Sequence, residues 1–61
     1  MTMYVVVTNC GKDGLWYWGM WEDITQALDV TQELYHMNHE LQYLVITLEE
    51  AKKIGVNNLP R

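Results

Sequence analysis

Several residue types are scarce or missing in this 61-residue chain, and each absence excludes a class of structure or function. The single cysteine excludes an internal disulfide, and the scattered Cys and His residues supply no zinc-finger ligand set. The chain contains no serine, which excludes a serine nucleophile. No apolar run approaches the roughly 20 residues that span a bilayer, so we expect no membrane partner.

Positive charge is also scarce. Eight Asp and Glu residues against four Lys and Arg give a net charge of −4, which works against binding a phosphate backbone. We therefore expect no direct binding of nucleic acid. Residues 1–7 have no basic flank and too short an apolar stretch for a secretory signal, so the sequence predicts a cytoplasmic protein.

The length predicts one small domain over residues 1–61, and a domain of this size is hard to stabilise. A chain of about 60 residues buries only about 60% of the surface that its unfolded form exposes. Seven aromatic residues and 49% hydrophobic residues nevertheless predict a folded chain. Because disulfides are excluded and no metal site is apparent, the extra stability must come from aromatic packing, self-association or a partner.

Three segments have the composition of β-strands. Residues 3–8 are apolar at both alternating sets of positions, which predicts a central strand buried on both faces. Turn-forming residues follow at 9–14, and residues 15–21 are again strand-like, so the pair predicts a β-hairpin. Residues 41–46 form the third predicted strand.

Two segments have helical patterns. The first predicted helix spans residues 24–38, and Asp23 stands three residues before Gln26 in the arrangement of a capping box. The second spans residues 48–54, begins with the capping box at 47–50 and ends at Gly55. The predicted core-facing side of the first helix consists of Ile24, Ala27, Leu28, Thr31, Leu34, Tyr35 and Asn38.

These elements predict an α+β fold with a three-stranded antiparallel sheet. If the third strand pairs with the free side of the first, the strand order is 2-1-3 and the most apolar strand lies in the centre. The long helix then covers one face, and the short C-terminal helix only partly covers the other. We expect residues 56–61 to lie loose or only lightly docked.

Two groups of residues deserve comparison with catalytic and metal sites. Glu33 and His36 have the Glu-x-x-His spacing of di-iron helices, with His39 one turn on, but a di-iron site needs that motif twice and further carboxylates. Cys10 lies near Lys12 in the hairpin turn, but no base is near it in sequence, which favours an incidental cysteine. We predict no cofactor, no metal, no catalytic residue and no enzymatic activity.

The aromatic side chains of residues 15–21 have two interpretations. They either fill the core under the helices, or some stay exposed and bind a partner, as Trp and Tyr do at interface hot spots. Strict alternation predicts two opposite sets across Gly19: Trp16, Trp18 and Met20 on one face, and Tyr17 and Trp21 on the other.

Acidic residues line the polar side of the long helix. Glu22, Asp29, Glu33 and Glu40 recur at spacings of 7, 4 and 7 residues. A solvated helix face is the simpler interpretation. The alternative is a recognition surface that imitates the phosphates of a nucleic acid and binds a basic groove.

Four segments form one further pattern: residues 4–8 (YVVVT), 14–19 (GLWYWG), 21–28 (WEDITQAL) and 43–46 (YLVI). Together they resemble small ββαβ accessory proteins of tailed bacteriophages. The resemblance implies a phage-encoded protein that binds and modulates a host protein in the host cytoplasm, and it assigns no site residues.

The sequence therefore predicts a small non-enzymatic protein-binding module with an unidentified protein partner. The alternatives are an acidic nucleic-acid mimic that inhibits a DNA- or RNA-binding protein, and a self-associating structural module. Edge pairing of the second or third strand would permit a homodimer. The predicted partner-binding residues are Trp16, Tyr17, Trp18, Trp21, Glu22, Asp29, Glu33 and Glu40.

Overall fold

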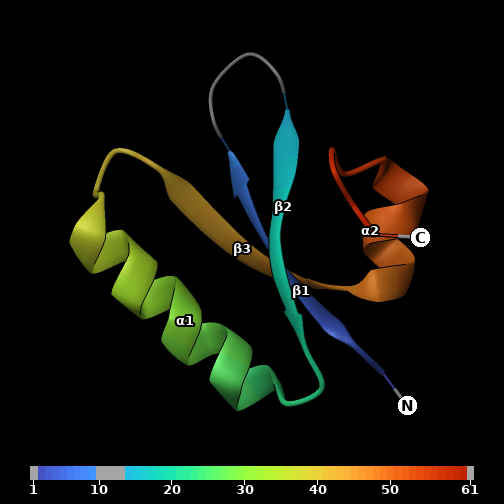
Figure 1. Cartoon of the computed structure of the whole chain (residues 1–61), viewed down its shortest axis with the longest axis horizontal. Coiled ribbons are helices and arrows are strands. Elements are labelled where there is room, and N and C mark those ends of the chain that lie inside the picture. The colour runs from blue at the N-terminus through green and yellow to red at the C-terminus, as the bar shows by residue number, and fades with distance from the viewer. Residues whose placement is uncertain (1, 10–13, 61) are drawn as a thin grey trace.

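The computed structural model of the chain describes residues 2–9 and 14–60. Its elements confirm the predicted α+β class and follow one another in the predicted order (Figure 1). The predicted boundaries of every element are correct to within one residue. The elements are β1 (Tyr4–Asn9), β2 (Leu15–Trp21), α1 (Ile24–Met37), β3 (Gln42–Thr47) and α2 (Leu48–Ile54).

The sheet has the order β2-β1-β3 with antiparallel pairing on both sides of β1, as predicted. Its central strand carries Val5, Val6 and Val7, which are completely buried. β-Branched side chains suit a strand that is covered on both faces. Helix α1 covers one face of the sheet and α2 the other (Figure 1).

A β-bulge in β2 changes which side chains share a face. Val6 pairs with Gly19 but Val7 pairs with Tyr17, so Trp18 is the extra residue between them. An extra residue in one strand shifts the alternation by one position. Tyr17 and Met20 therefore share the face of the core that packs under α2.

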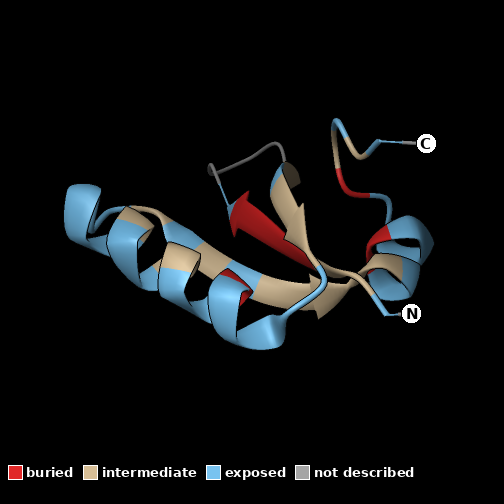
Figure 2. Cartoon of the chain, turned by 60° about the horizontal axis from the view of Figure 1, so that its bottom comes forward, coloured by how far each residue is buried: buried red, intermediate tan, exposed pale blue. Residues whose placement is uncertain are grey.

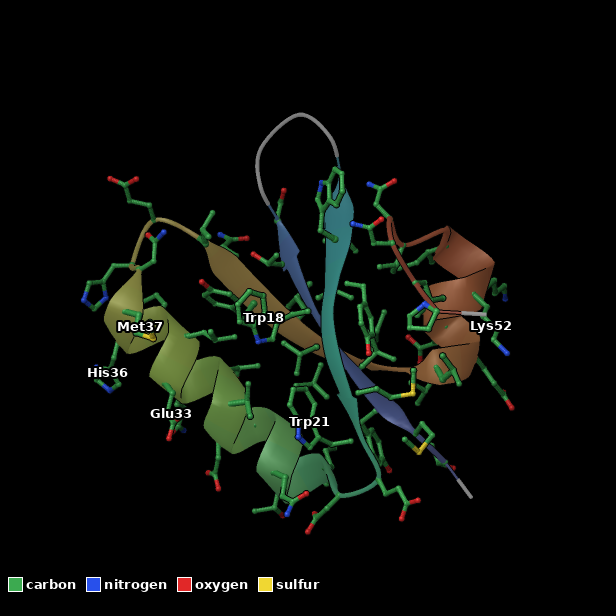
Figure 3. All side chains as sticks on the ribbon, viewed as in Figure 1. Trp18, Trp21, Glu33, His36, Met37 and Lys52 are labelled. Atoms are coloured by element: carbon green, nitrogen blue, oxygen red, sulfur yellow. The ribbon has the colours of Figure 1, made fainter. Side chains whose placement is uncertain are left out.

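The bulge makes the predicted division of the β2 side chains wrong. Strict alternation put Met20 with Trp16 and Trp18, and Tyr17 with Trp21. In the structure Trp18 and Trp21 both extend from β2 toward α1 (Figure 3). A Cβ atom at Gly19 would collide with the Trp21 ring, so glycine leaves the space in which that ring lies across the strand.

Helix α1 begins at the predicted cap but buries little of its surface. The Asp23 carboxylate accepts a hydrogen bond from the Thr25 amide at 2.8 Å, so the cap bond goes to Thr25 and not to Gln26. Only Ala27 is buried, and Figure 2 shows most of the helix exposed. Four residues of the predicted core-facing side are exposed, because the helix presents an adjacent side to the sheet: Ile24, Leu28, Tyr35 and Asn38.

Helix α2 is capped as predicted at both ends. The Thr47 hydroxyl accepts a hydrogen bond from the Glu50 amide at 3.2 Å, and Gly55 ends the helix with a φ of 79°. The segment that follows is docked and not loose. Val56 is buried in the core with Val5, Val7 and Ala51, and Leu59 packs against this cluster.

Candidate functional site

The outer edge of β2 is partly covered by the C-terminal segment. The Tyr17 amide donates to the Asn57 carbonyl at 2.9 Å, and the Asn57 amide donates to the Leu15 carbonyl at 2.9 Å. These bonds form an isolated parallel bridge between Trp16 and Asn57. The expectation that β2 is a free sheet edge is therefore wrong over its first half, because the segment after α2 returns to pair with it.

The outer edge of β3 differs. The Leu48 amide donates to the Met3 carbonyl at 2.9 Å, which extends the antiparallel register of β1 and β3 by one pair. Hydrogen-bonded pairs alternate in such a register, so Leu44 and Ile46 direct their amides toward β1. The backbone groups of Tyr43 and Val45 point outward, and β3 pairs with no second strand among the described residues.

Exposed apolar side chains lie beside this open edge. Leu28 and Tyr35 of α1 are 47% and 52% exposed, and they share one stripe of the helix with Ile24. Tyr35 and Thr31 line a hollow of about 240 Å³ with Tyr43 of β3, which places the stripe on the β3 side of α1. We call the following set the β3 edge surface: Ile24, Leu28, Tyr35, Tyr43, Leu44 and Val45.

Leu44 is the most exposed strand residue of this surface. It pairs with Val7, which faces α2, but its side chain is 52% exposed because α2 covers only part of that face. Strand β3 also has no proline and no charged residue over its whole length. Proteins usually protect an open edge with such residues.

The predicted aromatic candidates are mainly part of the packing. Trp16, Tyr17 and Trp21 are half-buried, and only Trp18 is largely exposed, at 54%. Tyr17 packs against the core under α2. The Trp16 indole nitrogen is buried without a hydrogen-bond partner in the described structure, so it is not presented to a partner at the surface. Trp18 is therefore the aromatic of β2 best placed for an intermolecular contact.

The predicted acidic candidates all lie at the surface. Glu22, Asp29, Glu33 and Glu40 are exposed, and the Glu33 side chain extends away from the sheet in Figure 3. Asp29 and Glu33 lie on the side of α1 opposite Ala27, whereas Leu28 and Tyr35 lie on the flank. Glu22 precedes the helix and Glu40 follows it. The acidic side and the β3 edge surface are consequently separate parts of the molecular surface.

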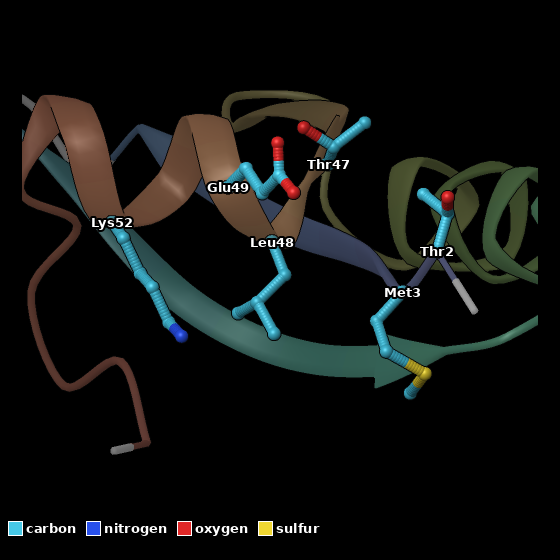
Figure 4. Close-up of a pocket in the computed structure, with 6 residues that line it drawn as sticks. All are labelled: Thr2, Met3, Thr47, Leu48, Glu49 and Lys52. Atoms are coloured by element: carbon cyan, nitrogen blue, oxygen red, sulfur yellow. The ribbon is translucent and has the colours of Figure 1, made fainter.

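Two hollows lie near α2. One of about 350 Å³ is lined by Thr2, Met3, Thr47, Leu48, Glu49 and Lys52, and Figure 4 shows Glu49 and Lys52 extending to opposite sides of it. A larger one of about 670 Å³ lies between α2 and the segment after it and is lined mainly by apolar residues and Lys52. In the first hollow the Thr47 hydroxyl already accepts the cap hydrogen bond from the Glu50 amide.

The Glu33 and His36 pair is not extended into a metal site. Over residues 2–9 and 14–60, no group of three His, Cys, Asp or Glu side chains could hold a metal ion. The His39 ring instead contacts the Tyr35 ring edge to face, with 4.9 Å between the ring centroids. Cys10 and Lys12 lie outside the described residues.

Comparisons with protein-family models, curated proteins and solved structures found no match. Among the described residues no helix is long and apolar enough to cross a membrane. Our list of candidate residues, drawn from the sequence, omitted Leu28, Tyr35 and the residues of β3. The lack of proline and charge in residues 42–47 was the signal that could have identified this strand as an unprotected edge.

Proposed function

We propose that this chain is a small non-enzymatic protein-binding module that binds through the β3 edge surface. The observation that carries the proposal is the row of outward backbone groups at Tyr43 and Val45 beside exposed Leu28, Tyr35 and Leu44. An open strand edge binds an extended segment through main-chain hydrogen bonds, and neighbouring apolar side chains add specificity.

The small core gives a physical reason for binding. The largest fully buried side chains among the described residues are valines, while large apolar side chains of α1 and β3 remain exposed. Burying apolar surface is worth about 25 cal/mol per Å². A partner that covers the β3 edge surface would therefore stabilise both the complex and the fold of this chain.

The resemblance to phage accessory proteins suggests the class of partner. On that basis we propose a phage-encoded modulator or inhibitor that binds a host protein in the host cytoplasm. The −4 charge disfavours a nucleic acid as the direct ligand. The proposed surface uses backbone groups and apolar side chains, which suit a protein.

Site-specific photo-crosslinking tests this function. A photo-reactive amino acid replaces Leu44 in one variant and Ile54 in the control, and both variants are expressed in the source cells. The two positions are similarly exposed, at 52% and 56%, but Ile54 lies on α2. We expect protein adducts from position 44 and few from position 54. Equal labelling, or no adduct at position 44, would contradict the proposed binding surface.

The exposure of all four acidic candidates favours one alternative function, an acidic mimic of nucleic acid. This alternative predicts a partner that DNA or RNA displaces in a salt-dependent manner. Under this alternative, reversing Asp29 and Glu33 to Lys would abolish binding of the partner. Under the β3 edge proposal, the same double reversal would leave crosslinking from position 44 unchanged. If the double reversal leaves partner binding intact, the acidic side is not the recognition surface.

A further inference from the structure

We infer that the β3 edge surface pairs with the same surface of a second copy of this chain. Two β3 strands would run antiparallel about a two-fold axis and join the two three-stranded sheets into one continuous sheet. The inference rests on the proposed function, because it uses the same surface, and it names a second copy of the chain, in place of a host protein, as the occupant.

The backbone register sets how two copies can meet. Since Tyr43 and Val45 direct their amides outward, Tyr43 of one copy can form a hydrogen-bonded pair with Val45 of the other. The two-fold axis then passes between the two Leu44 residues, which form a non-hydrogen-bonded pair. Side chains are closest in such pairs, so the two exposed Leu44 side chains would bury each other.

Charge favours a second copy as the occupant. Two identical surfaces repel each other if they carry charge of one sign, and this chain has a net charge of −4. The β3 edge surface nevertheless contains no Asp, Glu, Lys or Arg, and the carboxylates of α1 lie on the side opposite Ala27. Two copies of this surface can therefore meet without bringing like charges of the surface together.

The contrast between the two edges supports the same conclusion. The edge of β2 has a bulge at Trp18 and a backbone cover from Asn57, both of which oppose pairing with another strand. Within the described residues, the edge of β3 has neither a bulge nor another segment paired with it. An unprotected, uncharged edge rich in β-branched residues pairs readily with an identical strand.

Sedimentation equilibrium from low micromolar to millimolar concentration tests the inference. We expect the mass to rise from the 7.2 kDa of one chain toward that of two. Leu44→Lys should weaken dimerisation by about tenfold or more, because it places two like charges opposite each other. Ile54→Lys, at a similarly exposed residue of α2, should leave dimerisation unchanged. Circular dichroism of both variants checks that the monomer remains folded.

Amide hydrogen exchange provides a second measurement that does not depend on a substitution. Protection of the Tyr43 and Val45 amides should rise with concentration, whereas that of Leu44 and Ile46, which face β1, should be present throughout. A mass of one chain at all concentrations, equal effects of the two Lys variants, or a dimer without protection at Val45 would each overturn the inference.

The outcomes separate this inference from the proposed function. A strict monomer whose position 44 still crosslinks to another protein retains the binding function and excludes the second copy. A strict monomer without adducts at position 44 excludes both. A dimer in which position 44 crosslinks only to a second copy of the chain supports the inference and identifies the chain as a self-associating module.

Discussion

The outer edges of β2 and β3 differ in whether another segment of the chain pairs with their backbone groups. Strand β2 has an extra residue at Trp18, and Asn57 pairs with its outer backbone through two hydrogen bonds of 2.9 Å. Strand β3 directs the backbone groups of Tyr43 and Val45 outward, without a strand partner in the described chain. The comparison shows that closing one edge leaves the other edge as the surface available for pairing.

The connectivity explains the difference. Helix α2 follows β3 directly and lies across the face of the sheet opposite α1 (Figure 1). The segment after Gly55 therefore emerges beside β2 and not beside β3. Val56 anchors this segment in the core, which brings the next residue into reach of the β2 backbone.

The largest expected effect comes from placing a charge at Val56, the buried residue that holds the C-terminal segment beside β2. Val56→Asp places a charge where the side chain is only 7% exposed, and an uncompensated buried charge costs about 3 kcal/mol or more. Urea denaturation should show this loss in the free energy of unfolding. Ile54→Asp, two residues earlier at an exposed position, should cost only about 1 kcal/mol, because a negative charge is mildly unfavourable at the C-terminal end of α2. Similar losses in the two variants would mean that the C-terminal segment does not pack as described.

Removing one of the two backbone hydrogen bonds between Asn57 and β2 should have a smaller effect on stability. Asn57→Pro deletes the amide that donates to the Leu15 carbonyl, and we expect a loss of about 1–2 kcal/mol. Asn57→Ala keeps that amide and is the matched control. If thermal unfolding shows no difference between the proline and alanine variants, the bridge to β2 contributes nothing to stability.

Amide exchange compares the two edges directly in the unmodified protein. The Tyr17 amide donates to Asn57, whereas the Val45 amide faces outward without an intramolecular partner strand. In dilute solution the Tyr17 amide should exchange at least about tenfold more slowly than that of Val45. Equal rates at low concentration would contradict the description of one covered and one open edge.

The smallest expected effect is that of the acidic side of α1 on stability. Asp29→Lys and Glu33→Lys change exposed residues away from both edges. The free energy of unfolding should change by less than about 0.5 kcal/mol, because exposed charges contribute little. A larger change in a thermal melt would show that these carboxylates support the fold and are not simply solvated.

The candidate site was less predictable than the fold. The aromatic composition of β2 predicted a binding surface, because Trp and Tyr are common at interfaces, but most of its rings are half-buried. The helix pattern correctly identified Ala27, yet the side of α1 that meets the sheet is offset, which leaves Leu28 and Tyr35 exposed. A periodic pattern gives the apolar side of a helix but not the rotation at which it packs.

The sequence by itself determined the elements and their order. The β-branched run at residues 5–8 made β1 the central strand. Asp23 and Thr47 began the two helices and Gly55 ended the second, because these signals act over a few neighbouring residues. Only the tertiary structure decided the bulge at Trp18, the docking of Asn57 and the open edge of β3. Each of these depends on how segments distant in sequence pair with one another, and hydrogen-bond register between strands is not encoded in the pattern of one strand alone.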